Sequence, residues 1–243
     1  MSTHPKTTVV TFTLLNYPVR YWYRAFANMG RWLMRPFQAE GLRFQKLMGS
    51  GRHFSAWPDW STYVFLGVWD SEEAARNFFG SGVWANHTAG TTATGTLWLQ
   101  PYQSHGQWDG LNPFECDPEA ARPPGGPVAV LTRATIRTGA LIDFWRHVPQ
   151  ARARLKSHAD DLLFSVGVGE KPVVQQCTVS VWQSEQAISQ FAYRESGHKE
   201  VVRRTRERRW YTEELFARFS VTGANGSFAE QLHMTEPKTA SET

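Results

Sequence analysis

The chain of 243 residues contains an internal repeat. The clearest match pairs VWDSEEAARNFF at 68–79 with VWQSEQAISQFA at 181–192. Two further pairs match upstream, in the same order in both halves: FQKLMG at 44–49 with FSVGVG at 164–169, and TVVTFTLL at 8–15 with VAVLTRAT at 128–135. Chance similarity would not preserve this order, so we infer two copies of one folding unit.

Both halves predict the same six elements in the same order, which is that of the ferredoxin-like β-α-β-β-α-β unit. In the first half these are a strand at 8–15, a helix at 19–34, strands at 42–48 and 61–68, a helix to about 80, and a strand at about 96–102. In the second half they are 127–136, 138–156, 162–168, 173–182, a helix to about 193, and about 214–222. Ser71 and Ser184 each precede an acidic residue, which is typical of a helix N-cap.

Such a unit covers one face of its sheet with helices and leaves the other face bare. We therefore predict an α+β fold in which two ferredoxin-like repeats pack sheet to sheet as a dimeric α/β barrel. The predicted parts are an N-terminal repeat at 1–102, a linker at 103–126, a C-terminal, haem-binding repeat at 127–222, and a disordered tail at 223–243. Trp108 and Phe114 indicate that the linker packs against the barrel.

Composition narrows the class of protein. The net charge of +4 is too small to indicate a nucleic-acid partner by itself. Cys116 and Cys177 are the two cysteines, which give no disulfide framework, and we expect both to be reduced. The N-terminus lacks the apolar core of a signal peptide, and no apolar run approaches the ~20 residues that span a bilayer. These features predict a soluble, cytoplasmic protein that is at most peripheral to a membrane.

Familiar catalytic motifs are missing from the sequence. It contains no Cys or His pair at zinc spacing, no His-Glu-x-x-His and no nucleophile elbow. The short GSG at 49–51 and GVG at 167–169 predict tight turns rather than phosphate-binding loops.

Several longer motifs resemble one known family. They are PVAVLTRATIR at 127–137, FWRHVP at 144–149, LLFSVGVGE at 162–170, GH at 197–198, EELFARF at 213–219 and PDWSTYVFLGVW at 58–69. Together they are similar to spheroidene monooxygenase, the carotenoid ketolase of purple bacteria, over roughly 8–223. The resemblance implies haem b as cofactor and oxygen insertion into a hydrophobic substrate. The stretch TAGTTATGT at 88–96 departs from the family, which leaves the substrate open.

The resemblance also points to the axial ligand of the haem. In related haem barrels, such as dye-decolourising peroxidases, chlorite dismutases and aldoxime dehydratases, an axial His comes from the second half. His198 fits that place, because it follows Gly197 and begins a helix-forming run, and imidazole is a haem ligand. A local hydrogen bond at a helix start is the alternative role. His87 is its counterpart in the first half, and we rank it below His198.

Other candidate residues surround this predicted site. Arg133 is our candidate for a catalytic donor on the distal face, with a sheet arginine paired to a carboxylate as the alternative. Leu131 and Thr135 share its strand face. The predicted apolar walls of the cofactor site are Phe144, Trp145, Phe164 and Trp182, for each of which core packing is the competing role.

The run KEVVRRTRERR at 199–209 is the densest charge in the chain. It predicts a solvated helix face, a contact for haem propionates, or a docking surface for an acidic ferredoxin or an anionic membrane. A nucleic-acid site would need interleaved exposed aromatics, so we predict none. Self-association is left open.

Three functions follow from these features. The first is a haem-dependent monooxygenase acting on an apolar or aromatic small molecule, with dioxygen as co-substrate and electrons from a ferredoxin or reductase. The second is a haem dehydratase or peroxidase of the same barrel type. The third is a non-enzymatic carrier of an apolar ligand, or a cofactor-free barrel oxygenase.

Overall fold

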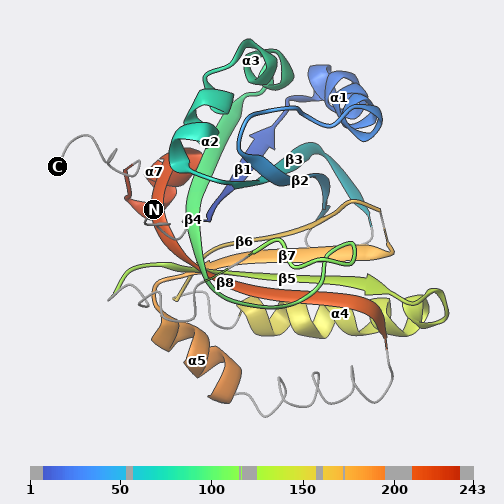
Figure 1. Cartoon of the computed structure of the whole chain (residues 1–243). Coiled ribbons are helices and arrows are strands. Elements are labelled where there is room, and N and C mark those ends of the chain that lie inside the picture. The colour runs from blue at the N-terminus through green and yellow to red at the C-terminus, as the bar shows by residue number, and fades with distance from the viewer. Residues whose placement is uncertain are drawn as a thin grey trace.

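The computed structural model describes residues 8–52, 57–114, 116, 125–156, 161–171, 173–194 and 210–235. They form a closed antiparallel barrel with the strand order β1-β3-β2-β6-β7-β5-β8-β4 (Figure 1). The α+β class and the barrel agree with the prediction. The barrel closes through hydrogen-bonded edges, β2 with β6 and β4 with β8, where the two halves of the chain meet.

Each half supplies its elements in the predicted order. The first half contains β1 (Val9–Asn16), η1 (Val19–Tyr21), α1 (Trp22–Met34), β2 (Leu42–Gly51), β3 (Pro58–Trp69), α2 (Glu72–Phe79), α3 (Gly82–Thr88) and β4 (Ala93–Gly106). The second contains β5 (Val128–Ile136), η3 (Thr138–Ala140), α4 (Leu141–Lys156), β6 (Leu162–Gly169), β7 (Gln175–Trp182), α5 (Glu185–Arg194), β8 (Tyr211–Gly226) and α7 (Ser227–Leu232). Helix α3 was not predicted.

The predicted caps are present. The Ser71 hydroxyl accepts a hydrogen bond from the Ala74 N–H at 3.1 Å, and the Ser184 hydroxyl accepts one from the Ala187 N–H at 3.2 Å. Each bond satisfies a backbone donor that the first helical turn leaves unpaired.

The barrel interior is the main core. Side chains from alternate positions of the strands fill it, among them Phe12, Leu66, Leu131 and Phe219. Helix α7 adds Phe228 to this core, so residues 223–235 complete β8 and form a helix rather than the disordered tail that we predicted from residue 223. The composition of this segment is polar, but Phe228 and Leu232 bury against the barrel and hold it.

The predicted linker begins as a strand. Strand β4 runs on to Gly106 and pairs with β8 as far as Leu215. Trp108 and Phe114 are buried in the barrel core, as their aromatic character predicted.

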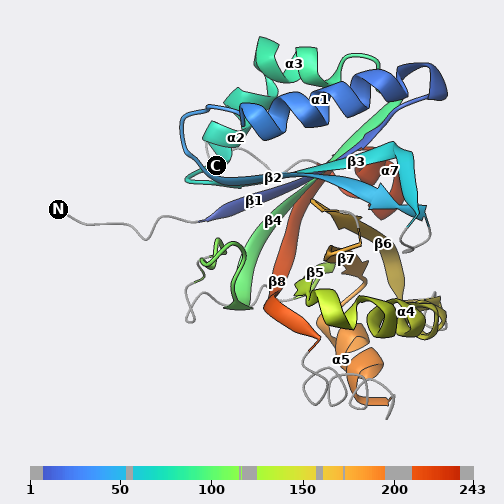
Figure 2. The same ribbon diagram turned by 90° about the vertical axis from the view of Figure 1, so that its right-hand side faces the viewer.

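The outer face of each half carries its own helices. Helices α1, α2 and α3 cover the first half, and α4 and α5 lie on the far side of the barrel beside the second half (Figures 1 and 2). None of the helices in the described residues is long and apolar enough to cross a membrane.

Candidate functional site

The strand registers show which positions correspond between the halves. Val9 lies opposite Trp69 in the first half, and Val128 lies opposite Trp182 in the second. Strands β2 and β6 both have an irregularity before Phe44 and Phe164, at the same place relative to these tryptophans. Corresponding side chains therefore point to the same side of the barrel wall.

This register corrects one predicted alignment by a single residue. We matched 8–15 with 128–135, whereas the pairing with Trp69 and Trp182 matches Val9 with Val128. A shift of one residue moves every side chain of a strand to the opposite face of the sheet. With this correction, the Thr132 side chain is on the outer face of the sheet, toward the helices, and the Arg133 side chain faces the barrel interior.

Large side chains in the first half are replaced by small ones in the second. On the outer face beneath the first-half helices, Phe65 pairs with Leu47 across β3 and β2. The corresponding pair across β7 and β6 is Thr178 with Gly167. Leu15 of β1 likewise corresponds to Ala134 of β5, since each lies six residues beyond the Val9 or Val128 reference. We call Thr132, Ala134, Gly167 and Thr178 the small-residue face.

Within the small-residue face Thr132 is exposed and Thr178 half-buried, whereas Ala134 and Gly167 are buried; the counterparts in the first half are all filled and buried. In the first half, Phe65 has no exposed surface, and its ring centroid lies 5.5 Å from that of Phe37 and 5.3 Å from that of Trp84. Thr13 is also buried, and its hydroxyl lies 2.9 Å from that of Thr96.

Thr132, at the position of Thr13, is exposed although β5 is hydrogen-bonded on both sides, to β7 and β8. A central-strand side chain on the helix-covered face is ordinarily buried, so the exposure of Thr132 marks a position that the described side chains do not cover as they cover Thr13.

Phe144 and Trp145 lie on α4, beside the second half. The Trp145 indole N–H donates to the carbonyl of Val173 at 3.1 Å. The Phe144 ring packs edge-on against Trp210, at 5.9 Å between centroids. These contacts fix the N-terminal part of α4, and they place two of the four predicted wall residues on the helical side of the barrel.

The other two predicted wall residues lie elsewhere. Phe164 packs inside the barrel against Phe228, with ring centroids 4.8 Å apart. Trp182 is buried between β7 and α5, where its ring lies 5.0 Å from that of Phe191. The structure therefore does not bring Phe144, Phe164 and Trp182 into one wall, and the competing role of core packing describes the last two.

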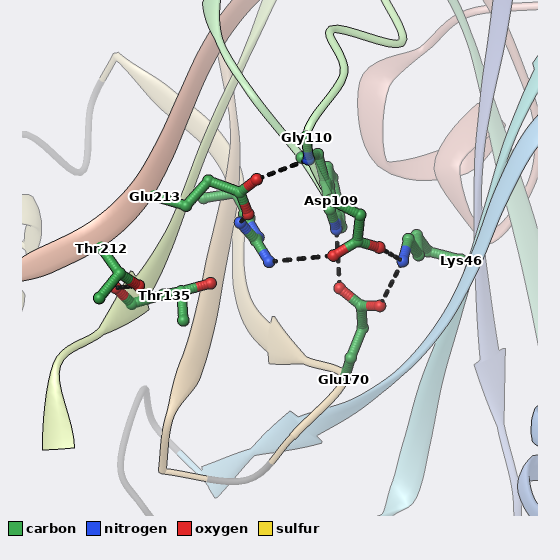
Figure 3. Close-up of polar contacts among 9 residues, drawn as sticks. Lys46, Asp109, Gly110, Thr135, Glu170, Thr212 and Glu213 are labelled. Carbon is green, nitrogen blue, oxygen red and sulfur yellow. Dashed lines mark hydrogen bonds and ion pairs between the residues drawn. The ribbon is translucent and has the colours of Figure 1, made fainter.

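Arg133 belongs to an ion cluster at one end of the barrel interior, made by Lys46, Asp109, Arg133, Glu170 and Glu213 (Figure 3). Its side chain is 1% exposed, pairs with Glu213, and lies 3.7 Å from an Asp109 carboxylate oxygen. The guanidinium also lies over the Trp108 ring at 5.5 Å. Arg133 and Thr132 point to opposite sides of β5, and the pairing of Arg133 with Glu213 is what the alternative role, a sheet arginine paired to a carboxylate, predicts.

The ion cluster joins segments far apart in the sequence. Lys46 of β2 bonds both Asp109 and Glu170, which follow β4 and β6, and the Trp108 indole N–H donates to Glu170 at 2.7 Å. Burial raises the pKa of Glu213, but hydrogen bonds from the Gly110 N–H and from Arg133 outweigh it, so that the pKa lies below its usual value. The sequence suggested a carboxylate partner for Arg133 but not the other members of this cluster, because they share no motif.

The histidines differ in their surroundings. His198 lies outside the described residues, so its predicted role as ligand is untested. His87 of α3 is packed against Phe37 and Trp84, and burial, with Arg31 and Arg24 nearby, lowers its pKa to about 4. Its half-buried ring packs with the aromatic core of the first half.

His147 of α4 is a second candidate ligand. One ring nitrogen, Nδ1, lies 2.7 Å from the carbonyl oxygen of Asp143, and the ring packs against Trp210 at 5.2 Å. Metal-binding histidines commonly use one nitrogen for such a carbonyl bond and keep the other for the metal. Within the described residues, no cluster of three or more His, Cys, Asp or Glu side chains could hold a bare metal ion.

Known proteins resemble this chain over most of its length. No protein-family model matches it. Spheroidene monooxygenase of Rhodobacter capsulatus is 35% identical over 198 residues, which cover 80% of this chain and 82% of that protein. The protein of the same name from Rubrivivax gelatinosus is 31% identical over 182 residues, covering 74% and 68%.

A solved structure, that of an aldoxime dehydratase, matches 89% of the chain and 82% of its own length with a TM-score of 0.55 at 12% identity. At that identity it supports the fold alone. The identity to the two spheroidene monooxygenases, over most of both chains, shows that this chain belongs to the spheroidene monooxygenase family.

Proposed function

We propose that this protein is a haem-dependent monooxygenase that inserts oxygen into an apolar or aromatic small molecule. The small-residue face and α4 would form the haem site in the second half. The observation that carries the proposal is the exposure of Thr132 on a central strand, beside Thr178 where the first half has the buried Phe65. We further propose that the two halves arose by duplication and that one of them kept the site.

The residues of the small-residue face suit a flat macrocycle. Removing the side chains of a Phe and two Leu residues leaves room that ordinary packing would otherwise fill, because protein interiors are close-packed. Phe144 and Trp145, which pack against each other on α4, would supply the apolar lining that such sites usually have. The corresponding surface in the first half offers no such room, which favours one site per chain.

Haem, when bound, supplies the iron and the oxygen chemistry. The protein's own residues position it and keep its surroundings apolar. His198 is our proposed axial ligand, and His147 is the alternative among the described residues, because its Nδ1 contact with Asp143 orients the ring. Thr132 and Thr178 keep the sheet side of the site small.

The proposed substrate is hydrophobic, of the class named for the relatives, and electrons come from a separate ferredoxin or reductase. The basic run at 199–209 lies outside the described residues, and its contact with haem propionates or an acidic donor stays a prediction. A haem dehydratase or peroxidase is the alternative. Turnover of an aldoxime or a peroxide without an electron donor would favour that alternative.

The absorption spectrum of the purified protein titrated with haem tests the proposal. Wild type is expected to develop a Soret band at one haem per chain. His198→Ala is expected to lose or shift that band, whereas His147→Ala is expected to keep it. The reverse pattern would assign His147 as the ligand. A wild-type protein that folds but shows no Soret band with excess haem would refute the cofactor and the mechanism together.

A further inference from the structure

Helix α1 has an outward face that is unusually apolar. Val19, Tyr23, Phe26, Leu33 and Met34 are between 62% and 78% exposed. Tyr23, Phe26, Leu33 and Met34 follow one another at spacings of three, seven and one residues, which places them on one side of the helix. The opposite side, with Ala25, Asn28 and Trp32, is buried against the barrel. The helix is therefore apolar on both its buried side and its solvent side.

Two tryptophans extend this surface beyond the helix. Trp60 of β3 is 41% exposed, and its ring lies 6.0 Å from that of Phe26. Trp57, just before β3, is 76% exposed. We call the exposed residues Val19, Tyr23, Phe26, Leu33, Met34, Trp57 and Trp60 the α1 apolar surface.

Arginines run along one edge of the α1 apolar surface. Residues 8–39 contain four charged side chains, and all four are arginine: Arg20, Arg24, Arg31 and Arg35. Their spacing of four, seven and four residues puts them in one row. Arg20, Arg31 and Arg35 are exposed, while Arg24 donates to Asn86 of α3.

We propose that the α1 apolar surface docks on the surface of a bilayer that contains anionic lipid. An interfacial helix has this composition, with Trp, Phe and Leu entering the acyl boundary and a cationic row meeting the headgroups. Arginine stems cover apolar surface while their charged ends remain at the interface. The charge complements an anionic headgroup layer, and this inference does not depend on the proposed haem chemistry.

A second copy of this chain fits the surface less well. A two-fold contact sets a patch against itself. Whichever way the two-fold axis runs, the copy of residues 8–39 offers Arg20, Arg31 and Arg35 no carboxylate, because arginine is the only charged residue type in that segment. An acidic protein would pair with the arginines, but it would not explain why large apolar side chains such as Met34 and Tyr23 are exposed beside them.

The geometry of the barrel sets the orientation on the membrane. Helix α1 lies on the opposite side of the barrel from α4 and α5 in both views (Figures 1 and 2). Docking through α1 therefore leaves the second-half helices facing away from the bilayer.

Vesicle co-sedimentation of the purified full chain tests this proposal. The protein is expected to pellet with vesicles of phosphatidylcholine and phosphatidylglycerol at three to one, and to pellet less with phosphatidylcholine alone. Raising salt from about 0.1 M to about 1 M shortens the Debye length from about 10 Å to about 3 Å and should weaken the binding. If the wild-type protein stays in the supernatant with both kinds of vesicle, the proposal is overturned. Binding to an acidic protein instead would then identify the arginines as a protein-docking site.

Two sets of variants separate the apolar and charged contributions. Phe26→Ser, Leu33→Ser and Met34→Ser combined should abolish binding to both kinds of vesicle. Arg20→Gln, Arg31→Gln and Arg35→Gln combined should lower binding to anionic vesicles about a hundredfold, at about fivefold or ~1 kcal/mol for each arginine. Arg24 is left intact because of its contact with Asn86.

The matched control is Ile142→Ser, which replaces an exposed apolar residue on α4 and should bind vesicles like wild type. Unfolding midpoints identify any variant that fails to fold. The binding of the serine variant is interpreted only if its unfolding midpoint matches that of wild type. The arginine variant changes only exposed residues, so it tests the proposal even if the serine variant does not fold. Wild-type affinity in either folded variant contradicts the proposal.

Discussion

Filling the small-residue face with a large side chain should lower the affinity for haem without lowering the stability of the haem-free protein. Thr178→Phe restores at β7 the side chain that β3 carries at Phe65, where the ring is fully buried. Burying a Phe side chain is worth about 1.5–3 kcal/mol relative to exposure. Without haem, the variant should therefore be as stable as wild type or up to roughly 2 kcal/mol more stable.

The same ring would occupy space that we assign to the cofactor. Overpacking a filled site costs about 1–3 kcal/mol, which corresponds to about a 5- to 140-fold loss of haem affinity. Urea unfolding of the haem-free protein measures the first effect, and titration of the Soret band measures the second.

Two controls define the result. Thr178→Val changes polarity but adds no ring, so haem affinity should stay near that of wild type. Phe65→Thr empties the first-half core and should cost about 3 kcal/mol of stability with little effect on haem affinity. If the folded Thr178→Phe variant binds haem as tightly as wild type, the cofactor does not sit on this face.

Three further predictions concern buried groups. The pKa of His87 is about 4 against an ordinary 6.5, so between these pH values the unfolded chain binds a proton that the folded chain excludes. Stability should then fall by up to roughly 3 kcal/mol as pH drops through that window, and His87→Phe should remove this slope in urea unfolding measured from about pH 7 to about pH 4.5. Glu213→Ala removes the hydrogen-bonded carboxylate of the buried Arg133 and leaves only Asp109, 3.7 Å away, so it should cost up to about 3–5 kcal/mol in the same assay, whereas a cost below about 1 kcal/mol would mean that Asp109 or water already compensates Arg133. Burial raises the pKa of the Cys177 thiol, so a thiol reagent should titrate only Cys116 in the native protein and both cysteines after unfolding.

The order of the elements could be predicted from the sequence. The matched segments around Trp69 and Trp182 indicated two halves with the same strands and helices, and the serines at 71 and 184 indicated where two helices begin. These signals are local: an N-cap or a strand followed by a helix is encoded within a few residues of itself. The buried linker residue Trp108 was also predictable, because a large aromatic in a connecting segment rarely stays in water.

The tertiary structure alone decided which side chains meet. Arg133 and Thr132 are neighbours in sequence but serve an ion cluster and an open sheet face on opposite sides of β5, because strand side chains alternate and the register depends on distant partners. The bond from Lys46 to Glu170 joins residues 124 positions apart, and no local pattern records it. The strand pairing likewise directs the Phe164 side chain into the barrel interior, whereas Phe144 lies on α4 outside the barrel. The sequence therefore determined the repeated strands and helices but not α3 or α7, and long-range packing determined which faces became core or surface.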